Sequence, residues 1–140
     1  MKNIRYDLLL KWILWLVAIH SICFGISLVI LPISVIELFG FHLTEKFFAD
    51  QGGVFHLVVA VAYIWAALDL ENSFKLIVLS CTAKFVATIF LLSFFFFVVP
   101  KWMVIFSGLA DFLMGFTILV LYILYRKQST QIISSVSLKD

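Results

Sequence analysis

Charged residues are scarce in this sequence, and their scarcity excludes most classes of soluble protein. Only 13% of the 140 residues are Asp, Glu, Lys or Arg, whereas soluble domains contain about 25%. Hydrophobic residues make up 64%, and a water-soluble fold of this length has too little core to enclose them. Most apolar side chains must therefore face lipid. The composition predicts an integral membrane protein whose first partner is the lipid bilayer.

The sequence also lacks a large excess of positive or negative charge, and it lacks metal-binding motifs. The net charge is only +2, and no basic face is present, so a nucleic-acid partner is not expected. The two cysteines, Cys23 and Cys81, lie inside apolar runs and are expected to be small packing residues. No CxxC, HExxH or ExxH spacing occurs, so no metal site is predicted.

Four stretches have almost no charge and are long enough to cross about 30 Å of hydrocarbon as helices. They cover residues 12–31, 52–68, 76–99 and 102–124. The second is short, and either local thinning of the bilayer or a start a few residues earlier would complete it. Backbone groups in lipid must be paired within the segment, which predicts an all-α, four-helix transmembrane bundle over residues 1–127. Residues 128–140 are expected to form a polar, loosely held cytoplasmic tail.

The ends of these stretches indicate topology. Residues 12–31 are too long an apolar run for the core of a signal peptide, so a cleaved leader is rejected. Seven Lys and Arg residues fall on the side of the termini and two, Lys46 and Lys101, fall on the other. Both termini are therefore predicted to be cytoplasmic.

The segment 33–51 mixes apolar and charged residues and is expected to lie in the outer interface. Gly40 divides it. Thr44 is expected to cap a short helix, and Asp50 is expected to cap the next span.

Each predicted span carries one strongly polar residue: His20, His56, Lys84 and Asp111. Such residues are rare at membrane depth and are candidates for function, although pairing with one another as structural contacts is the alternative. Counting along the helices places Lys84 and Asp111 at levels about 4 Å apart. Both lie on stripes of small or hydroxyl residues that are typical of packed helix seams. We predict that Lys84 and Asp111 are direct partners.

The other polar residues indicate a pocket. Gln51, His56 and Tyr63 follow one stripe of the second span, which predicts a small pocket open to the outside and ending near Lys84 and Asp111. A simple helix start beneath the interfacial segment is the alternative. His20 is expected near the level of Lys84, roughly 12 Å from the level of His56, which argues against a haem held by both histidines.

The order of these features resembles the DoxX-like superfamily of small bacterial membrane proteins, in particular its four-helix relatives of the DUF4345 type. The shared features are Gly25 leading to Pro32, the Phe39-Gly40-Phe41 turn, Gly52-Gly53, the basic residue Lys84 and the Pro100 turn. The resemblance implies a location in the bacterial inner membrane. For the better-known members it implies subunits of membrane oxidoreductase assemblies that touch the quinone pool, and it assigns no catalytic residue here.

The leading prediction is a non-enzymatic membrane subunit or small-ligand-binding bundle. Its candidate ligand-binding residues are Gln51, His56, Tyr63, Lys84, Asp111 and His20. No cofactor is predicted, and the ligand is expected to be a lipid-like or quinone-like molecule. Two alternatives stay open: a quinone-interacting redox subunit that relays protons, and a transporter of a small hydrophobic solute. A partner subunit or a second copy of the chain is the expected protein partner.

Overall fold

The structure is a computed structural model that describes residues 4–40, 42–98 and 100–137. In chain order it contains α1 (Tyr6–Ile30), α2 (Ile33–Glu37), α3 (Phe47–Leu68), α4 (Phe74–Phe97) and α5 (Trp102–Ser137), with no strand in these ranges. All but α2 are long and apolar enough to cross a membrane. The all-helical fold with four candidate membrane spans is confirmed.

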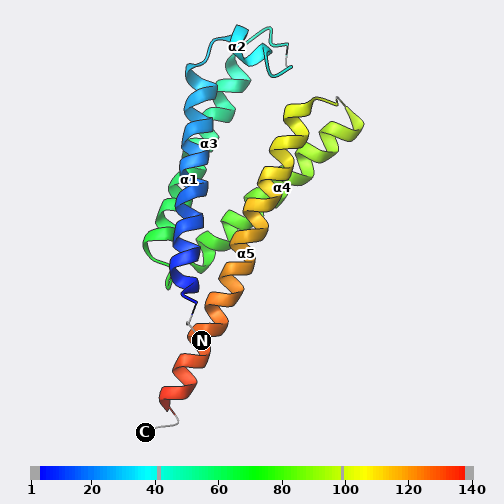
Figure 1. Ribbon diagram of the computed structural model, residues 1–140. Helices are drawn as coiled ribbons and strands as arrows, with labels where there is room; N and C mark the ends of the chain where they lie inside the picture. Colours follow the sequence, from blue (N-terminus) through cyan, green and yellow to red (C-terminus); the bar gives the residue numbers. More distant parts are fainter. Residues whose placement is uncertain (1–3, 41, 99, 138–140) are drawn as a thin grey trace.

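The four long helices form two antiparallel hairpins, α1 with α3 and α4 with α5. The hairpins contact each other through α1 and α5 and through α3 and α4. Figure 1 shows them meeting near the end that holds both termini and diverging toward the end that holds α2.

Two glycines bring α1 and α3 into contact. A Cβ atom added at Gly25 would lie 2.7 Å from the carbonyl oxygen of Gly53, and one added at Gly53 would lie 2.7 Å from the carbonyl oxygen of Gly25. Because no side chain fits there, the two backbones touch directly. The contact fixes how far α3 slides along α1.

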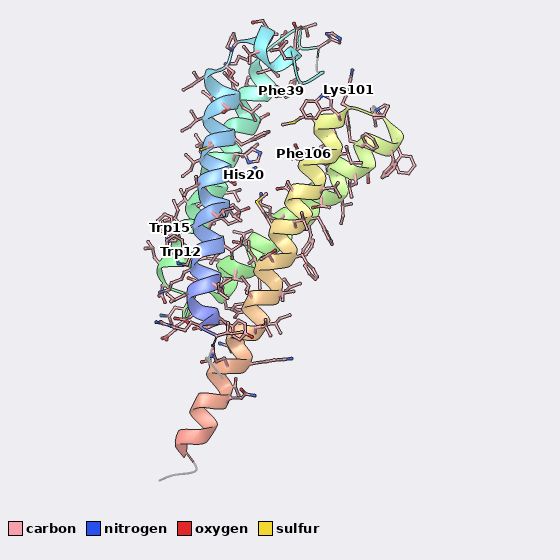
Figure 2. All side chains as sticks on the ribbon, in the orientation of Figure 1. Trp12, Trp15, His20, Phe39, Lys101 and Phe106 are labelled. Carbon is pink, nitrogen blue, oxygen red and sulfur yellow. The ribbon has the colours of Figure 1, made fainter. Side chains whose placement is uncertain are left out.

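The connection between α1 and α3 is held by side-chain packing and contains one glycine with a positive φ angle. Leu31 is extended before Pro32, as the residue preceding a proline prefers, and α1 ends there. Gly40 has φ +89°, a conformation that favours glycine, and the stem of Lys101 packs against it. The Phe39 ring lies 6.4 Å from that of Trp102 between centroids, so this segment reaches the start of α5 (Figure 2).

Several predicted boundaries differ from the structure. The helix of the span predicted from residue 52 begins earlier, at Phe47, which was one of the two alternatives for its short length. No helix is capped by Thr44; the residue preceding α3 is Lys46, and Asp50 lies within the first turn, where its carboxylate is 3.2 Å from the Lys46 ammonium. Lys46 also donates a hydrogen bond to the carbonyl oxygen of Val29. The hydrogen bond from Lys46 to the Val29 carbonyl oxygen, rather than a hydroxyl cap, therefore ties this helix start to α1.

The polar segment after residue 127, expected to be loosely held, continues α5 as helix to Ser137. Near its start, the Gln128 side-chain amide donates a 3.0 Å hydrogen bond to the carbonyl oxygen of Ile4. Phe41, Val99 and residues 1–3 and 138–140 lie outside the described residues, and with them part of the predicted Phe39–Phe41 turn and two of the counted lysines, Lys2 and Lys139.

The exposed surface of the spans is apolar. Trp12, Phe97 and Phe90 are 71%, 87% and 63% exposed, as expected of side chains that face lipid. The core lies toward the end that holds the termini and joins all four long helices: Leu10, Leu14, Val17, Ala18, Tyr63, Ala66, Ala67, Leu70, Ile77, Cys81 and Ile118. The four strongly polar residues of the spans lie on the α2 side of this apolar plug: His20, His56, Lys84 and Asp111.

Candidate functional site

Lys84 and Asp111 form an ion pair between α4 and α5. The Lys84 ammonium lies 2.6 Å from Asp111 Oδ1, and the residues are only 3% and 8% exposed. The predicted pairing is confirmed. In so apolar a setting each charge depends on the other, because an unpaired buried ion is strongly unfavourable.

The seam around this pair is built from small and hydroxyl residues, as its spacing predicted. A Cβ added at Gly115 would lie 2.9 Å from Lys84 Cβ, so glycine allows the backbones of α4 and α5 to approach at the pair. Ser80 and Thr88 are buried one turn to either side of Lys84. Each donates its hydroxyl proton to the carbonyl four residues earlier, so both are satisfied within α4.

Tyr63 brings α3 to the same place. Its side chain is only 1% exposed, and the Lys84 ammonium lies 5.8 Å from the centroid of its ring. This is within the range of a cation–π contact, which adds to the stabilisation of the lysine charge. The ion pair is thus flanked by the first hairpin as well as embedded in the second.

The two histidines lie closer together than predicted. The rings of His20 and Phe24 are 6.2 Å apart, and the rings of Phe24 and His56 are 4.9 Å apart, between centroids. The predicted separation of roughly 12 Å in level is wrong because the helices extend beyond the predicted spans. His20 lies ten residues before the end of α1, and His56 nine residues after the start of α3, so both are about 14–15 Å from the α2 end.

This correction bears on the cofactor argument. The difference in level was the reason for excluding a haem held by both histidines, and that reason no longer holds. The side chain of Phe24 contacts the rings of both His20 and His56. Among the residues that the structure describes, no group of three or more His, Cys, Asp or Glu is arranged to hold a metal ion.

Two cavities meet at these residues. The inter-hairpin cavity has a volume of about 240 Å³ and is lined by His20, Phe24, His56, Leu91, Met103, Val104, Phe106, Ser107, Ala110 and Asp111. The Tyr63 cavity has a volume of about 270 Å³ and is lined by Gly52, Phe55, His56, Val59, Tyr63, Ala83, Lys84, Ala87 and Asp111. His56 and Asp111 line both, so the two spaces adjoin across these side chains.

The structure therefore gathers five of the six predicted site residues and leaves one out. His20, His56, Tyr63, Lys84 and Asp111 line one or both cavities. Gln51 does not: it is exposed near the start of α3 and lines neither cavity. The predicted stripe from Gln51 to Tyr63 fails at its outer end because five residues separate Gln51 from His56, which puts Gln51 roughly 140° around α3 from His56.

The sequence reasoning missed the contribution of the first turns of α5. Met103, Ser107 and Asp111 recur every four residues and line one face of the inter-hairpin cavity. Phe106 adds an aromatic wall, and Figure 2 marks it on α5 on the side of the space opposite His20 on α1. Met103 could have been found from the sequence, because it lies two steps of four residues before Asp111 on the same helix face.

No protein-family model matches the chain, and comparison with curated proteins and with solved structures finds no match. The resemblance to the DoxX-like superfamily stays a prediction.

Proposed function

We propose that this membrane protein binds a small lipid-like or quinone-like molecule between its two hairpins, as a non-enzymatic bundle or subunit. The observation that carries the proposal is the inter-hairpin cavity, in which an apolar lining converges on His20, His56 and Asp111. Binding sites for small molecules typically combine an apolar wall with a few polar groups in this way.

The apolar plug favours binding over transport. Leu14, Ala66, Ile77 and Ile118 are buried between the cavities and the end that holds the termini. A transported solute needs access to both sides of the membrane, and these packed side chains oppose a path to the second side. The transporter alternative therefore receives less support than the binding alternative.

The redox alternative has one observation in its favour. His20, His56 and Asp111 line a single cavity, so groups able to exchange protons would surround a bound quinone. In that case the protein would work as a subunit of a membrane oxidoreductase, and the expected partner is another subunit of that assembly. Copurification of a redox partner would distinguish this role from simple binding.

Topology and location complete the proposal. Five basic residues lie at or near the helix ends on the side of the termini: Arg5, Lys11, Lys75, Arg126 and Lys127. Lys46 and Lys101 directly precede α3 and α5 at the α2 end. This bias supports a cytoplasmic location for both termini. We therefore propose that the protein belongs to a bacterial inner membrane, with α2 at the outer interface, and the resemblance to bacterial membrane proteins supports this location.

The test is native mass spectrometry of the detergent-purified protein with a matched pair of variants. Ser107→Phe adds a ring inside the inter-hairpin cavity, whereas Leu109→Phe adds the same ring on the lipid-facing side of α5, where Leu109 is 49% exposed. We expect a copurifying small molecule on the wild type and on Leu109→Phe, and its loss from Ser107→Phe. A molecule retained equally by both variants, or none on the wild type, would contradict the proposal.

A further inference from the structure

Several polar groups beside the two cavities have unused hydrogen-bonding capacity. Among the described residues, no hydrogen bond reaches the Tyr63 hydroxyl or the rings of His20 and His56. Lys84 has three N–H donors and uses one, to Asp111. Tyr63 and Lys84 are 1% and 3% exposed and lie in helices apolar enough to span a membrane, where an unmet donor is costly. These donors call for a partner inside the Tyr63 cavity.

The type of unused group indicates what the partner offers. Asp111 keeps one free acceptor oxygen, Oδ2, beside the Tyr63 cavity, and the free donors there are two N–H bonds of Lys84 and the O–H of Tyr63. An acceptor oxygen of a carbonyl or an ester satisfies them. A ligand with only apolar atoms would leave them unsatisfied.

The charges of the site indicate a neutral ligand. Lys84 and Asp111 cancel, and no other Lys, Arg, Asp or Glu lines either cavity. A charged headgroup would bring an uncompensated charge into a low-dielectric region, or would compete for a partner that is already paired at 2.6 Å. An uncharged head avoids both costs.

The inter-hairpin cavity suits the apolar part of such a ligand. Leu91, Met103 and Phe106 line it, and its volume of about 240 Å³ exceeds the roughly 150 Å³ of a cavity that holds benzene. His20 and Phe106 border it and are themselves exposed on membrane-spanning helices. The cavity therefore opens sideways, between α1 and α5, toward the lipid in which an amphiphile dissolves.

We infer that the site selects an uncharged amphiphile by its carbonyl-type oxygen. This oxygen accepts hydrogen bonds from Tyr63 and Lys84 in the Tyr63 cavity, and the apolar tail passes His56 into the inter-hairpin cavity. The inference rests on the proposed function and adds the chemical class of the ligand.

The experiment uses the full chain in phosphatidylcholine nanodiscs and four photoactivatable probes. All carry a diazirine on the same dodecyl tail, and their heads are a methyl ketone, a sulfonate, a trimethylammonium group and a methyl group. Labelled residues are mapped by peptide mass spectrometry. We expect the ketone to label Leu91, Met103 or Phe106 at least about tenfold more than each of the other three probes, as two hydrogen bonds of ordinary strength would give.

A pair of tyrosine variants tests the contact. Tyr63→Phe removes the hydroxyl at the cavity, and Tyr122→Phe removes one on α5 away from both cavities. We expect ketone labelling to fall about three- to tenfold in the first variant and to stay unchanged in the second.

The outcomes separate the two ideas. Preferential labelling by either charged probe, or equal labelling by the ketone and methyl probes, overturns the ligand class and leaves the binding cavity standing. The same labelling in Tyr63→Phe and wild type also overturns the inference. No labelling of the cavity residues by any probe overturns both the inference and the proposed function. Because the comparison of four heads needs only wild-type protein, a folding defect in Tyr63→Phe does not prevent the decision.

Discussion

The ammonium of Lys84 lies 2.6 Å from a carboxylate oxygen of Asp111, and this pair joins α4 to α5 at the point where α3 also arrives through Tyr63. The pair borders the Tyr63 cavity, and Asp111 borders the inter-hairpin cavity as well. One contact therefore serves the packing of three helices and the polar lining of the candidate site. Its structural and functional contributions have to be separated by experiment.

The first prediction concerns the energetic coupling of the pair. Lys84→Met and Asp111→Leu should each lower the free energy of unfolding in detergent by about 3–5 kcal/mol, because each leaves one buried charge without a partner. The double variant removes both charges, so its loss should be smaller than the sum of the single losses. Additive losses would show that the two residues are not coupled.

An exposed pair on the same chain provides the control. Arg5 and Asp7 form an ion pair at 2.9 Å, with side chains that are 66% and 36% exposed. Solvent screens this pair, so Asp7→Asn should change the free energy of unfolding by less than about 1 kcal/mol. A comparable loss at Asp7 would mean that burial does not account for the effect at Lys84.

The pair could be predicted from the sequence because Lys84 and Asp111 are each the one charged residue of an otherwise apolar span. A charged residue in an otherwise apolar helix needs a partner, and the short connection through Pro100 makes the helices of Lys84 and Asp111 neighbours. Depth counting then worked, since α5 does begin at Trp102 as predicted. The helix number, the pairing and the small-residue seam follow from such local rules.

The relative level of His20 and His56 did not follow from these rules. Hydropathy identifies the charge-free stretch of a helix but not the residues at which the helix begins and ends. Both α1 and α3 extend beyond their charge-free stretches. Their register is instead set by the backbone contact of Gly25 with Gly53, which only tertiary structure reveals. Gln51 lies outside the site for a different reason, since five residues separate it from His56 and so place it roughly 140° around α3 from that side chain.

The second prediction concerns Asp69, outside the spans. The Asn72 side-chain amide donates hydrogen bonds to its carboxylate, at 2.9 Å to Oδ2, and these hold the pKa of Asp69 below its ordinary value of 3.8. A depressed pKa stabilises the folded state above about pH 4, and the contribution is lost as pH falls through the folded pKa. Asn72→Ala should raise the pKa of Asp69 toward its ordinary value, as read from the carboxyl carbon by NMR titration. An unchanged titration would contradict the role of Asn72.

The third prediction concerns topology. On a background with Cys23 and Cys81 replaced by alanine, single cysteines are placed at Glu45, at the α2 end, and at Thr130, on the part of α5 beyond the bundle; both positions are exposed. A membrane-impermeant maleimide added to intact cells should label Glu45→Cys and spare Thr130→Cys, because the basic residues gather at the end of the termini. Permeabilised cells should show labelling at both. The reverse pattern in intact cells would invert the proposed orientation.

The fourth prediction uses two adjacent glycines of α3. Gly53→Ala places a methyl group 2.7 Å from the Gly25 carbonyl oxygen and 2.8 Å from a Val29 methyl group, so α1 and α3 must move apart. Overpacking of this kind should lower the free energy of unfolding by about 1–3 kcal/mol. Gly52→Ala is the matched control, because its methyl group meets only Leu28 Cδ1, at 3.9 Å. The control should be neutral or stabilising by up to about 1 kcal/mol, since alanine favours helix. Unfolding of both variants in detergent, followed by circular dichroism, gives the comparison, and equal effects at the two positions would show that the backbone contact does not set the register of the first hairpin.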